Sequence, residues 1–222
     1  MSNYRWEQIA AAGGLAFLVL GFGGQMLIQV GGSEPSFSAP AADILSFFQT
    51  RDPLLFNIGG YLSVLGMLAL IWFVGAVWAR LRRFEENPGW LSLVAVGSAL
   101  AGIAVSSSTT GWPMAVFRVE EGLDPQLARY LFDDGNFGFA TLWVFLAGFL
   151  LATGIAALRD GSLPRWLGWF ALGTSLILLV ARFIWDGPGG LVFLPYLLTG
   201  LWILITSIYL IRAAGKVSAS AV

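Results

Sequence analysis

The chain contains no cysteine and no histidine, and these absences exclude most familiar catalytic and metal-binding chemistry. Without cysteine there are no disulfides, thiol nucleophiles or thiolate metal ligands. Without histidine, the commonest general base, metal ligand and haem ligand is missing. The sequence therefore predicts a protein that is not an enzyme and that carries no cofactor and no metal ion.

Charge is also scarce. Charged residues make up 11% of the 222 residues, against about 25% in ordinary soluble domains. The formal net charge of −1 offers no basic face of the kind that nucleic acid binding requires. Hydrophobic residues make up 57%, and the mean hydropathy is +0.78. This composition predicts an integral membrane protein in contact with the lipid bilayer.

Six apolar stretches are long enough to cross a bilayer as helices. A helix rises about 1.5 Å per residue, so a hydrocarbon core of roughly 30 Å needs about 20 apolar residues. The first stretch is interpreted as a retained helix and not as a cleaved signal peptide, because its apolar run is long enough to span. We expect a single all-α domain over residues 1–222, a bundle of six transmembrane helices at about 9–30, 55–79, 89–112, 137–158, 165–185 and 191–212.

Arginine and lysine predict which way the bundle faces, because in short loops they favour the cytoplasmic side. With the N-terminus inside, the inner side holds eight: Arg5, Arg80, Arg82, Arg83, Arg159, Arg165, Arg212 and Lys216. The outer side then holds four: Arg51, Arg118, Arg129 and Arg182. We therefore expect both termini in the cytoplasm.

The two long outer loops each contain a segment with helical features. Ser38 is placed to cap a short helix that ends before Pro53, and Asp124 followed by Pro125 is a good helix start. Both segments carry apolar side chains, so we expect two short interfacial helices along the outer surface. They could cover a site as a lid, or they could connect the spans with their apolar faces in the lipid headgroups.

An internal match predicts that part of the bundle is duplicated. With a shift of 76 residues, the stretch 55–100 aligns without gaps with 131–176, and 13 of the 46 positions are identical. Helices two and three would then repeat as helices four and five, running in the same direction as in parallel-repeat transporters. The alternative is that any helical hairpin at the inner face favours an arginine, a proline and an interfacial tryptophan. The matched turn residues are Arg83, Pro88 and Trp90 with Arg159, Pro164 and Trp166.

The stretch LRDGSLPRWLGW, from Leu158 to Trp169, resembles a recurrent turn between helices four and five. That turn belongs to bacterial six-helix membrane proteins catalogued only as a domain of unknown function. The resemblance covers chiefly residues 130–212. It implies a multi-pass protein of a bacterial inner membrane. It carries over no functional residues, since that family has no established activity.

Polar side chains within the spans gather toward the outer ends of the helices. This one-sided polarity argues against a continuous pore or proton relay, which needs polar groups through the full thickness. It favours a pocket, open to the outside, for a small molecule or a lipid. The residues predicted to line it are Gln25, Gln29, Asn57, Tyr61, Ser107, Asn136, Thr141, Arg182 and Tyr196. Arg182 could hold an anion, pair with Asp186, Asp133 or Asp134, or extend to the interface.

We therefore expect a non-enzymatic binding or transport-associated module with an outward-facing polar pocket. The alternative is a structural or accessory subunit that works through contact with another membrane protein, which predicts no cavity. A carboxylate-dependent intramembrane enzyme would need Asp133 and Asp186 to converge in a cleft. Small residues four apart, such as Ser98 and Gly102, are better explained by tight packing within the chain than by a dimer interface.

Overall fold

The computed structural model describes residues 3–30, 32–185 and 190–219, and all the secondary structure in them is helical. Six of the helices form the long apolar segments that are able to cross a membrane. The predicted all-α polytopic bundle is thereby confirmed. The six helices are α1 (Asn3–Ile28), α3 (Pro53–Phe84), α4 (Trp90–Ser108), α6 (Pro125–Asp160), α7 (Arg165–Phe183) and α8 (Gly190–Ala219).

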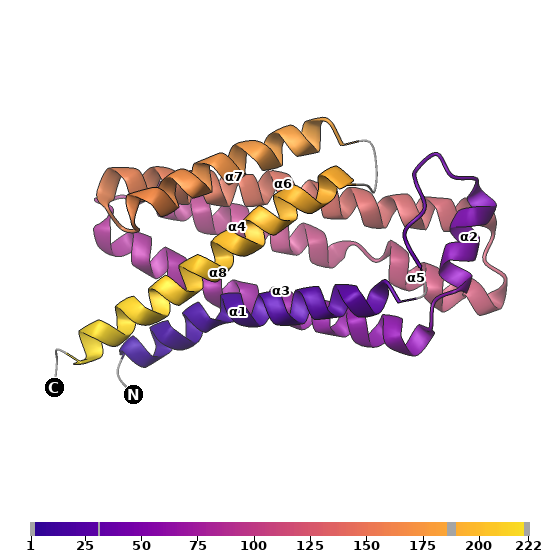
Figure 1. The fold of residues 1–222 in the computed structure, drawn as a ribbon, viewed down its shortest axis with the longest axis horizontal. Helices are drawn as coiled ribbons and strands as arrows, with labels where there is room; N and C mark the ends of the chain where they lie inside the picture. Colours follow the sequence, from indigo (N-terminus) through magenta and orange to yellow (C-terminus); the bar gives the residue numbers. More distant parts are fainter. Residues whose placement is uncertain (1–2, 31, 186–189, 220–222) are drawn as a thin grey trace.

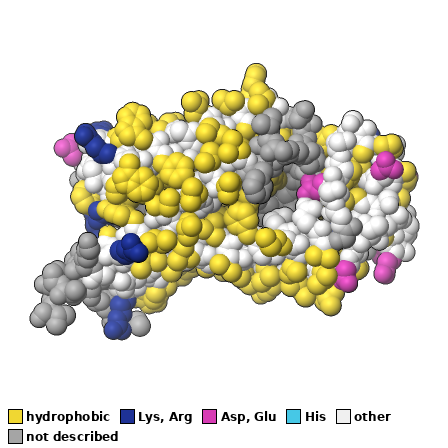
Figure 2. Space-filling model, viewed as in Figure 1, with side chains coloured by type: hydrophobic (Ala, Val, Ile, Leu, Met, Phe, Trp, Pro, Cys, Tyr) yellow, Lys and Arg dark blue, Asp and Glu magenta, His cyan; other side chains and the backbone are white. Residues whose placement is uncertain are grey.

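Both termini lie at one end of the bundle, which we call the inner end (Figure 1). The short helices α2 (Ala41–Gln49) and α5 (Gly111–Arg118) lie at the opposite, outer end. On the face shown in Figure 2, arginine side chains gather at the inner end, most acidic side chains lie toward the outer end, and hydrophobic side chains cover the middle. This is the charge pattern that the sequence predicts. The assignment of the inner end to the cytoplasm stays a prediction.

The helices pack in two groups: α1 lies along α3 and α8, and α4 and α7 lie along α6. Glycine allows the closest approach in the first group. A Cβ added at Gly24 would collide with the carbonyl of Gly59, and one added at Gly59 would collide with the carbonyl of Gly24. In the second group, Gly148 packs against Ser98. Small residues therefore serve contacts within the chain, as predicted, because backbones in lipid gain most from close packing.

Trp202 of α8 joins the two groups at the centre of the bundle. It is fully buried, and its ring meets those of Phe73 and Phe149 edge-on, with centroids 6.2 and 5.7 Å away. Its Nε1 donates to the carbonyl oxygen of Leu167 at 3.2 Å, so the buried indole N–H is satisfied. This one side chain of α8 thus contacts α3, α6 and α7.

The helix boundaries follow the register of the predicted duplication. With the shift of 76 residues, Phe84 at the end of α3 falls on Asp160 at the end of α6. Phe73 likewise falls on Phe149, and both rings contact Trp202. These observations agree with a repeat, and the duplication itself stays a prediction.

The inner turn between α3 and α4 is held by Glu85. Its carboxylate accepts hydrogen bonds from the backbone N–H groups of Leu91 (2.7 Å) and Ser92 (3.0 Å), which have no partner inside the first turn of α4. Burial acts to raise the pKa of Glu85, but these hydrogen bonds outweigh it and the pKa is lowered. The charged carboxylate therefore acts as the cap of α4.

Two expectations for the outer segments are wrong. The segment after Asp124 is not a separate interfacial helix. The Asp124 side chain caps it as predicted, accepting from Gln126 N and Leu127 N, but α6 then continues for 36 residues. Gly135 does not break the helix, because the ring of Trp112 packs against it and fills the space of a side chain.

The other error concerns the cap of α2. Helix α2 is present as predicted, but Pro40 occupies its N-cap position and no side chain caps it. The Ser38 hydroxyl lies 3.0 Å from that of Ser36 instead. Within the predicted span 89–112, α4 ends at Ser108, whose hydroxyl donates to Val105 O at 2.8 Å, while the apolar segment continues to Glu121. The separate helix α5 then follows.

The glycine contact between α1 and α3 predicts that alanine will lower stability at one position and leave it almost unchanged at the next. Gly59→Ala would force the two helices apart and cost about 1–3 kcal/mol of unfolding free energy. Gly60→Ala is the control, since a Cβ there meets nothing within 4 Å. Its effect should stay within about 0.5 kcal/mol. Thermal unfolding in mild detergent measures both, and equal midpoints for the two variants would show that the contact is not tight.

Candidate functional site

The outer end of the molecule has a hydrophobic core of its own. We call this region, residues 32–56 and 109–136, the outer cap. The largest of its fully buried side chains are Ile44, Phe48 and Phe132, which are 0–1% exposed. The apolar side of α2 therefore packs against protein and does not face lipid headgroups. The other members of this core are Ile28, Phe47, Phe56, Ala115, Val116, Leu123, Ala128 and Leu131.

Arg51, which follows α2, is buried in this cap and is only 5% exposed. Its guanidinium donates to the carbonyl oxygens of Val30 (3.0 Å) and Gly32 (2.9 Å), and more weakly to that of Ile28 (3.4 Å). It also lies 3.9 Å from the centroid of the Phe47 ring. The carbonyls at a helix C-terminus carry partial negative charge and lack partners in their own helix. Arg51 therefore caps α1 and ties it to α2.

Glu34 lies near this arginine in poorly solvated surroundings. Burial raises the pKa of Glu34, although a hydrogen bond from Gln29 and the charge of Arg51 oppose the change. Burial likewise lowers the pKa of Arg51, against the attraction of Glu34. Both shifts disfavour charge, so desolvation outweighs the attraction between the two groups.

Arg129 holds the loop that precedes α2. It projects from the outer part of α6, and its Nη2 donates to Phe37 O at 2.6 Å. Its Nη1 lies 3.4 Å from Ala39 O. Two arginines thus fix the irregular outer loop by binding backbone carbonyls that no helix satisfies. The cap is a built unit and not a loose connector.

The structure gives the surroundings of each of the nine residues predicted to line an outer pocket. Asn57, Ser107 and Gln25 are exposed, and Tyr61 is 66% exposed. The amide of Gln29 donates to Glu34, which belongs to the outer cap. These five residues lie on the surface or in loop contacts.

The other four predicted residues are used by their own surroundings. Asn136 and Thr141 bond back to carbonyls one turn earlier in α6, at 3.0 and 2.8 Å. Arg182 lies over the ring of Trp185, and Tyr196 packs against neighbouring rings. None of these contacts joins two of the nine residues, so the pocket stays a prediction. Asp186, named for an ion pair and for catalysis, lies outside the described residues.

A series of aromatic rings runs from Tyr196 to Trp185, the ring over which Arg182 lies. From Tyr196 the ring contacts run through Phe139 and Trp143 to Trp185, with centroid distances of 5.8–6.4 Å. Trp185 also meets Phe37 of the outer cap at 5.0 Å. Trp143 is 1% exposed, and neither its indole N–H nor that of Trp185 has an acceptor among the described residues.

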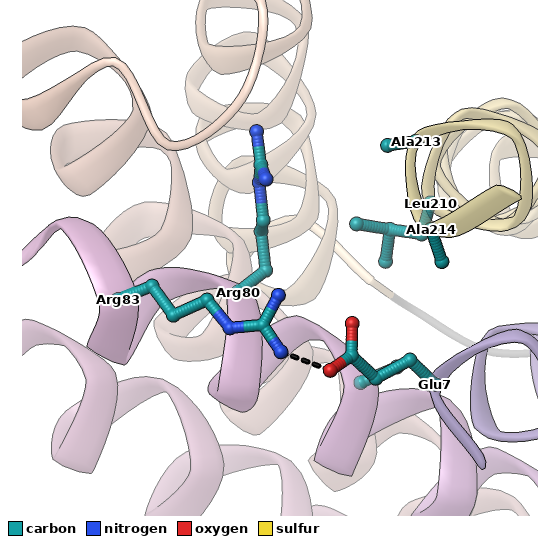
Figure 3. A pocket seen from close by; sticks show the side chains of 7 residues that line it. Glu7, Arg80, Arg83, Leu210, Ala213 and Ala214 are labelled. Atoms are coloured by element: carbon teal, nitrogen blue, oxygen red, sulfur yellow. Dashed lines mark hydrogen bonds and ion pairs between the residues drawn. The ribbon is translucent and has the colours of Figure 1, made fainter. Parts of the chain in front are cut away.

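The inner end carries a cleft that the sequence did not reveal. It lies between α1, α3 and α8, and its volume is about 30 Å³. Figure 3 shows Glu7 of α1 and Arg83 of α3 pointing toward one another and forming an ion pair. Arg80 projects from α3 beside the wall formed by α8, with its guanidinium pointing away from the Glu7–Arg83 pair (Figure 3). The remaining lining residues are Ala76, Leu210, Ala213 and Ala214.

Arg80 connects three parts of the inner end. Its Nε donates to Ser162 O at 2.7 Å, in the turn between α6 and α7. Its Nη2 lies 3.4 Å from the Tyr209 hydroxyl of α8, and its guanidinium lies 4.5 Å from the ring centroid of Phe84. The spacing of Arg80 and Arg83 places both on one helix face. Sequence could suggest that pairing, but it could not bring Glu7 beside them.

Because Arg51 is buried and hydrogen-bonded, we expect the local stability of the outer cap to depend on this one side chain. Arg51→Gln would leave the carbonyls of Val30 and Gly32, just after α1, without their donors and destabilise the cap locally by about 1–3 kcal/mol. Hydrogen exchange of residues 32–50 should become faster as a result. Arg118→Gln is the control, because Arg118 and its partner Glu121 are each 57% exposed. Unchanged exchange in Arg51→Gln would contradict the capping role.

Comparisons with known proteins add no relative from which a role could be transferred. No protein-family model matches the chain, and no curated protein and no solved structure matches it.

Proposed function

We propose that this protein is a non-enzymatic accessory module of a membrane complex, and that it presents the outer cap to a basic partner protein. The inner end, rich in arginine, is placed on the cytoplasmic side of a bacterial inner membrane. The cap then faces the opposite compartment. The observation that carries the proposal is the packed outer cap, whose formal net charge is negative.

The charge of the cap follows from its residues. Residues 32–56 and 109–136 contain eight acidic side chains and three arginines, a difference of five negative charges. The arginines are engaged: Arg51 and Arg129 bind carbonyls, and Arg118 pairs with Glu121. Asp43, Asp134 and Glu120 are among the acids that remain exposed. Such a field favours encounter with a positively charged surface.

Exposed apolar side chains in the cap supply contact area. Phe117 of α5 is 72% exposed, and Met114 on the same helix is 56% exposed. Tyr130 and Leu127, one turn apart on α6, are 66% and 48% exposed. Aromatic residues and methionine are enriched where proteins bind each other, and acidic residues around them provide specificity. The combination is typical of an interaction surface.

The interior of the bundle supports binding over conduction. Trp143 and Trp202 are 0–1% exposed in the middle of the helices, and both pack against phenylalanine rings. A conducting pathway needs polar groups or water through the full thickness of the membrane. Filling the centre with indole rings leaves little room for one. The outer cap is the stronger candidate for a working surface.

Crosslinking in native membranes tests the accessory role. The wild-type chain should yield a stoichiometric adduct through the cap. Added salt should lower the yield of this adduct, because screening shortens the range of the attraction between charges. The triple variant Asp43→Lys, Glu120→Lys, Asp134→Lys should lower the yield about tenfold or more. Glu86→Lys, an exposed charge reversal at the inner end, is the control.

Two outcomes would contradict the proposal. One is recovery of the crosslinked wild type as a lone chain without a stoichiometric partner. The other is an adduct whose yield is the same in the triple variant and in Glu86→Lys. Thermal unfolding of the three proteins shows that a lost adduct does not arise from a lost fold.

A second candidate function is the binding of a small molecule that carries a hydrogen-bond acceptor, beside Trp143 of α6 and Trp185, which follows α7. The buried indole N–H groups of Trp143 and Trp185 favour it, since neither has an acceptor among the described residues. An unsatisfied buried donor costs about 1–3 kcal/mol, which a ligand acceptor would recover.

Native mass spectrometry of gently extracted protein tests this candidate. Trp143→Phe should lower the retention of a copurifying small molecule about tenfold, since it removes one hydrogen bond. Trp166→Phe, a change of an exposed indole near the inner end, should leave retention unchanged. A wild-type chain that carries no small molecule under these conditions would rule the candidate out.

A further inference from the structure

The inner cleft combines positive charge with an apolar wall. Arg80 and Arg83 of α3 line one side together with Glu7 of α1, so the cleft carries two cationic groups and one anionic group. The opposite side consists of Leu210, Ala213 and other small side chains of α8. Positive charge beside apolar surface at the end of a membrane helix suits a group that lies at the boundary of lipid and water.

Arg80 retains hydrogen-bonding capacity toward the cleft. A guanidinium has five N–H donors, and the bonds to Ser162 O and the Tyr209 hydroxyl use two of them. Among the described residues no carboxylate lies within ion-pair distance of Arg80, since the ion pair in the cleft joins Arg83 to Glu7. Arg80 is therefore held in place by neutral groups while its charge stays uncompensated. Such a preorganised guanidinium matches the paired oxygens of a phosphate.

Glu7 occupies the position of a competitor. Its side chain is 23% exposed and that of Arg83 is 46% exposed, so the pair lies at the mouth of the cleft and contributes little to stability. A phosphate that enters beside Arg80 would come near the Glu7 carboxylate. The anion would then compete with Glu7 for Arg83.

We propose that the inner cleft binds a phosphate group, carried by the headgroup of an anionic phospholipid or present as a free ion. With a volume of about 30 Å³ the cleft admits little more than phosphate oxygens. The rest of a headgroup lies outside it, against the alanines of α8. Arg80 is the primary ligand, Arg83 the second, and Glu7 limits the affinity. This inference is independent of any partner at the outer cap.

The full-length protein in detergent tests this by native mass spectrometry with phosphatidylglycerol and phosphatidylcholine as probes. Both lipids contain phosphate, but choline neutralises the charge of the second. The wild type should retain phosphatidylglycerol about tenfold better. Arg80→Gln should remove this preference, and Arg165→Gln, a change of an exposed inner arginine outside the cleft, should keep it.

Glu7→Gln should increase lipid binding, an effect that would not be expected if the arginines of the cleft had only a structural role. It removes the competing carboxylate, so retention of phosphatidylglycerol should rise about threefold. Should Arg80→Gln fail to fold, Arg83→Gln replaces it, because the exposed Arg83 side chain can change without loss of the core. Unchanged or lower retention of phosphatidylglycerol in Glu7→Gln would exclude a lipid headgroup as the ligand, as would equal losses in Arg80→Gln and Arg165→Gln, and would leave only the free phosphate ion.

Inorganic phosphate distinguishes the two sources. If phosphate raises the thermal midpoint of the wild type, and raises it more in Glu7→Gln, while phosphatidylglycerol shows no preference, the ligand is the free ion. If phosphatidylglycerol is preferred and inorganic phosphate does not displace it, the ligand is a lipid headgroup. A wild type that responds to neither probe would overturn the assignment.

Discussion

Hydrocarbon offers the backbone no hydrogen-bond partner, and this constraint governs the whole bundle. Each segment that crosses must satisfy its own N–H and C=O groups, so the six spans are helices. Lipid also removes most of the hydrophobic drive that would press helices together in water. Close contact must come from shape, which is why Gly24 and Gly59 bring α1 against α3, and why Trp202 fills the centre between Phe73 and Phe149. The indole has an acceptor in Leu167 O, as a buried donor requires.

The constraint relaxes at the outer end, and the chain changes its means of folding there. With 36 residues, α6 is ~54 Å long, well beyond the roughly 30 Å of hydrocarbon. Its protruding turns become a wall of the outer cap, where the phenylalanines of α2 are buried against α5 and α6 in a core like that of a small soluble domain. The irregular loop beside it needs donors for its carbonyls, and Arg51 and Arg129 provide them. These two arginines, read from sequence only as outer charges, act as structural caps.

The ends of the molecule differ in how their charges are used. At the outer end the arginines bind carbonyls or a neighbouring glutamate, so exposed acids such as Asp43 and Asp134 dominate the surface. At the inner end Arg80 is bound only by neutral groups among the described residues, and its charge remains available. One end is thus suited to a basic partner and the other to an anion. The two proposals rest on different residues and fail independently.

Sequence alone determined what depends on local chemistry. Apolar runs of spanning length, the Asp124–Pro125 helix start and the excess of arginine at one end are visible without a fold, because each follows from neighbouring residues. Tertiary structure decided what depends on distant segments meeting. It joined the segment after Asp124 to a single long α6, in which Trp112 packs on Gly135. It also placed Glu7 beside Arg83, although 76 positions separate them. A side chain on a helix has only a few neighbours one turn away along the sequence, but it has many potential partners across the bundle. Only the packing of the helices selects among those partners.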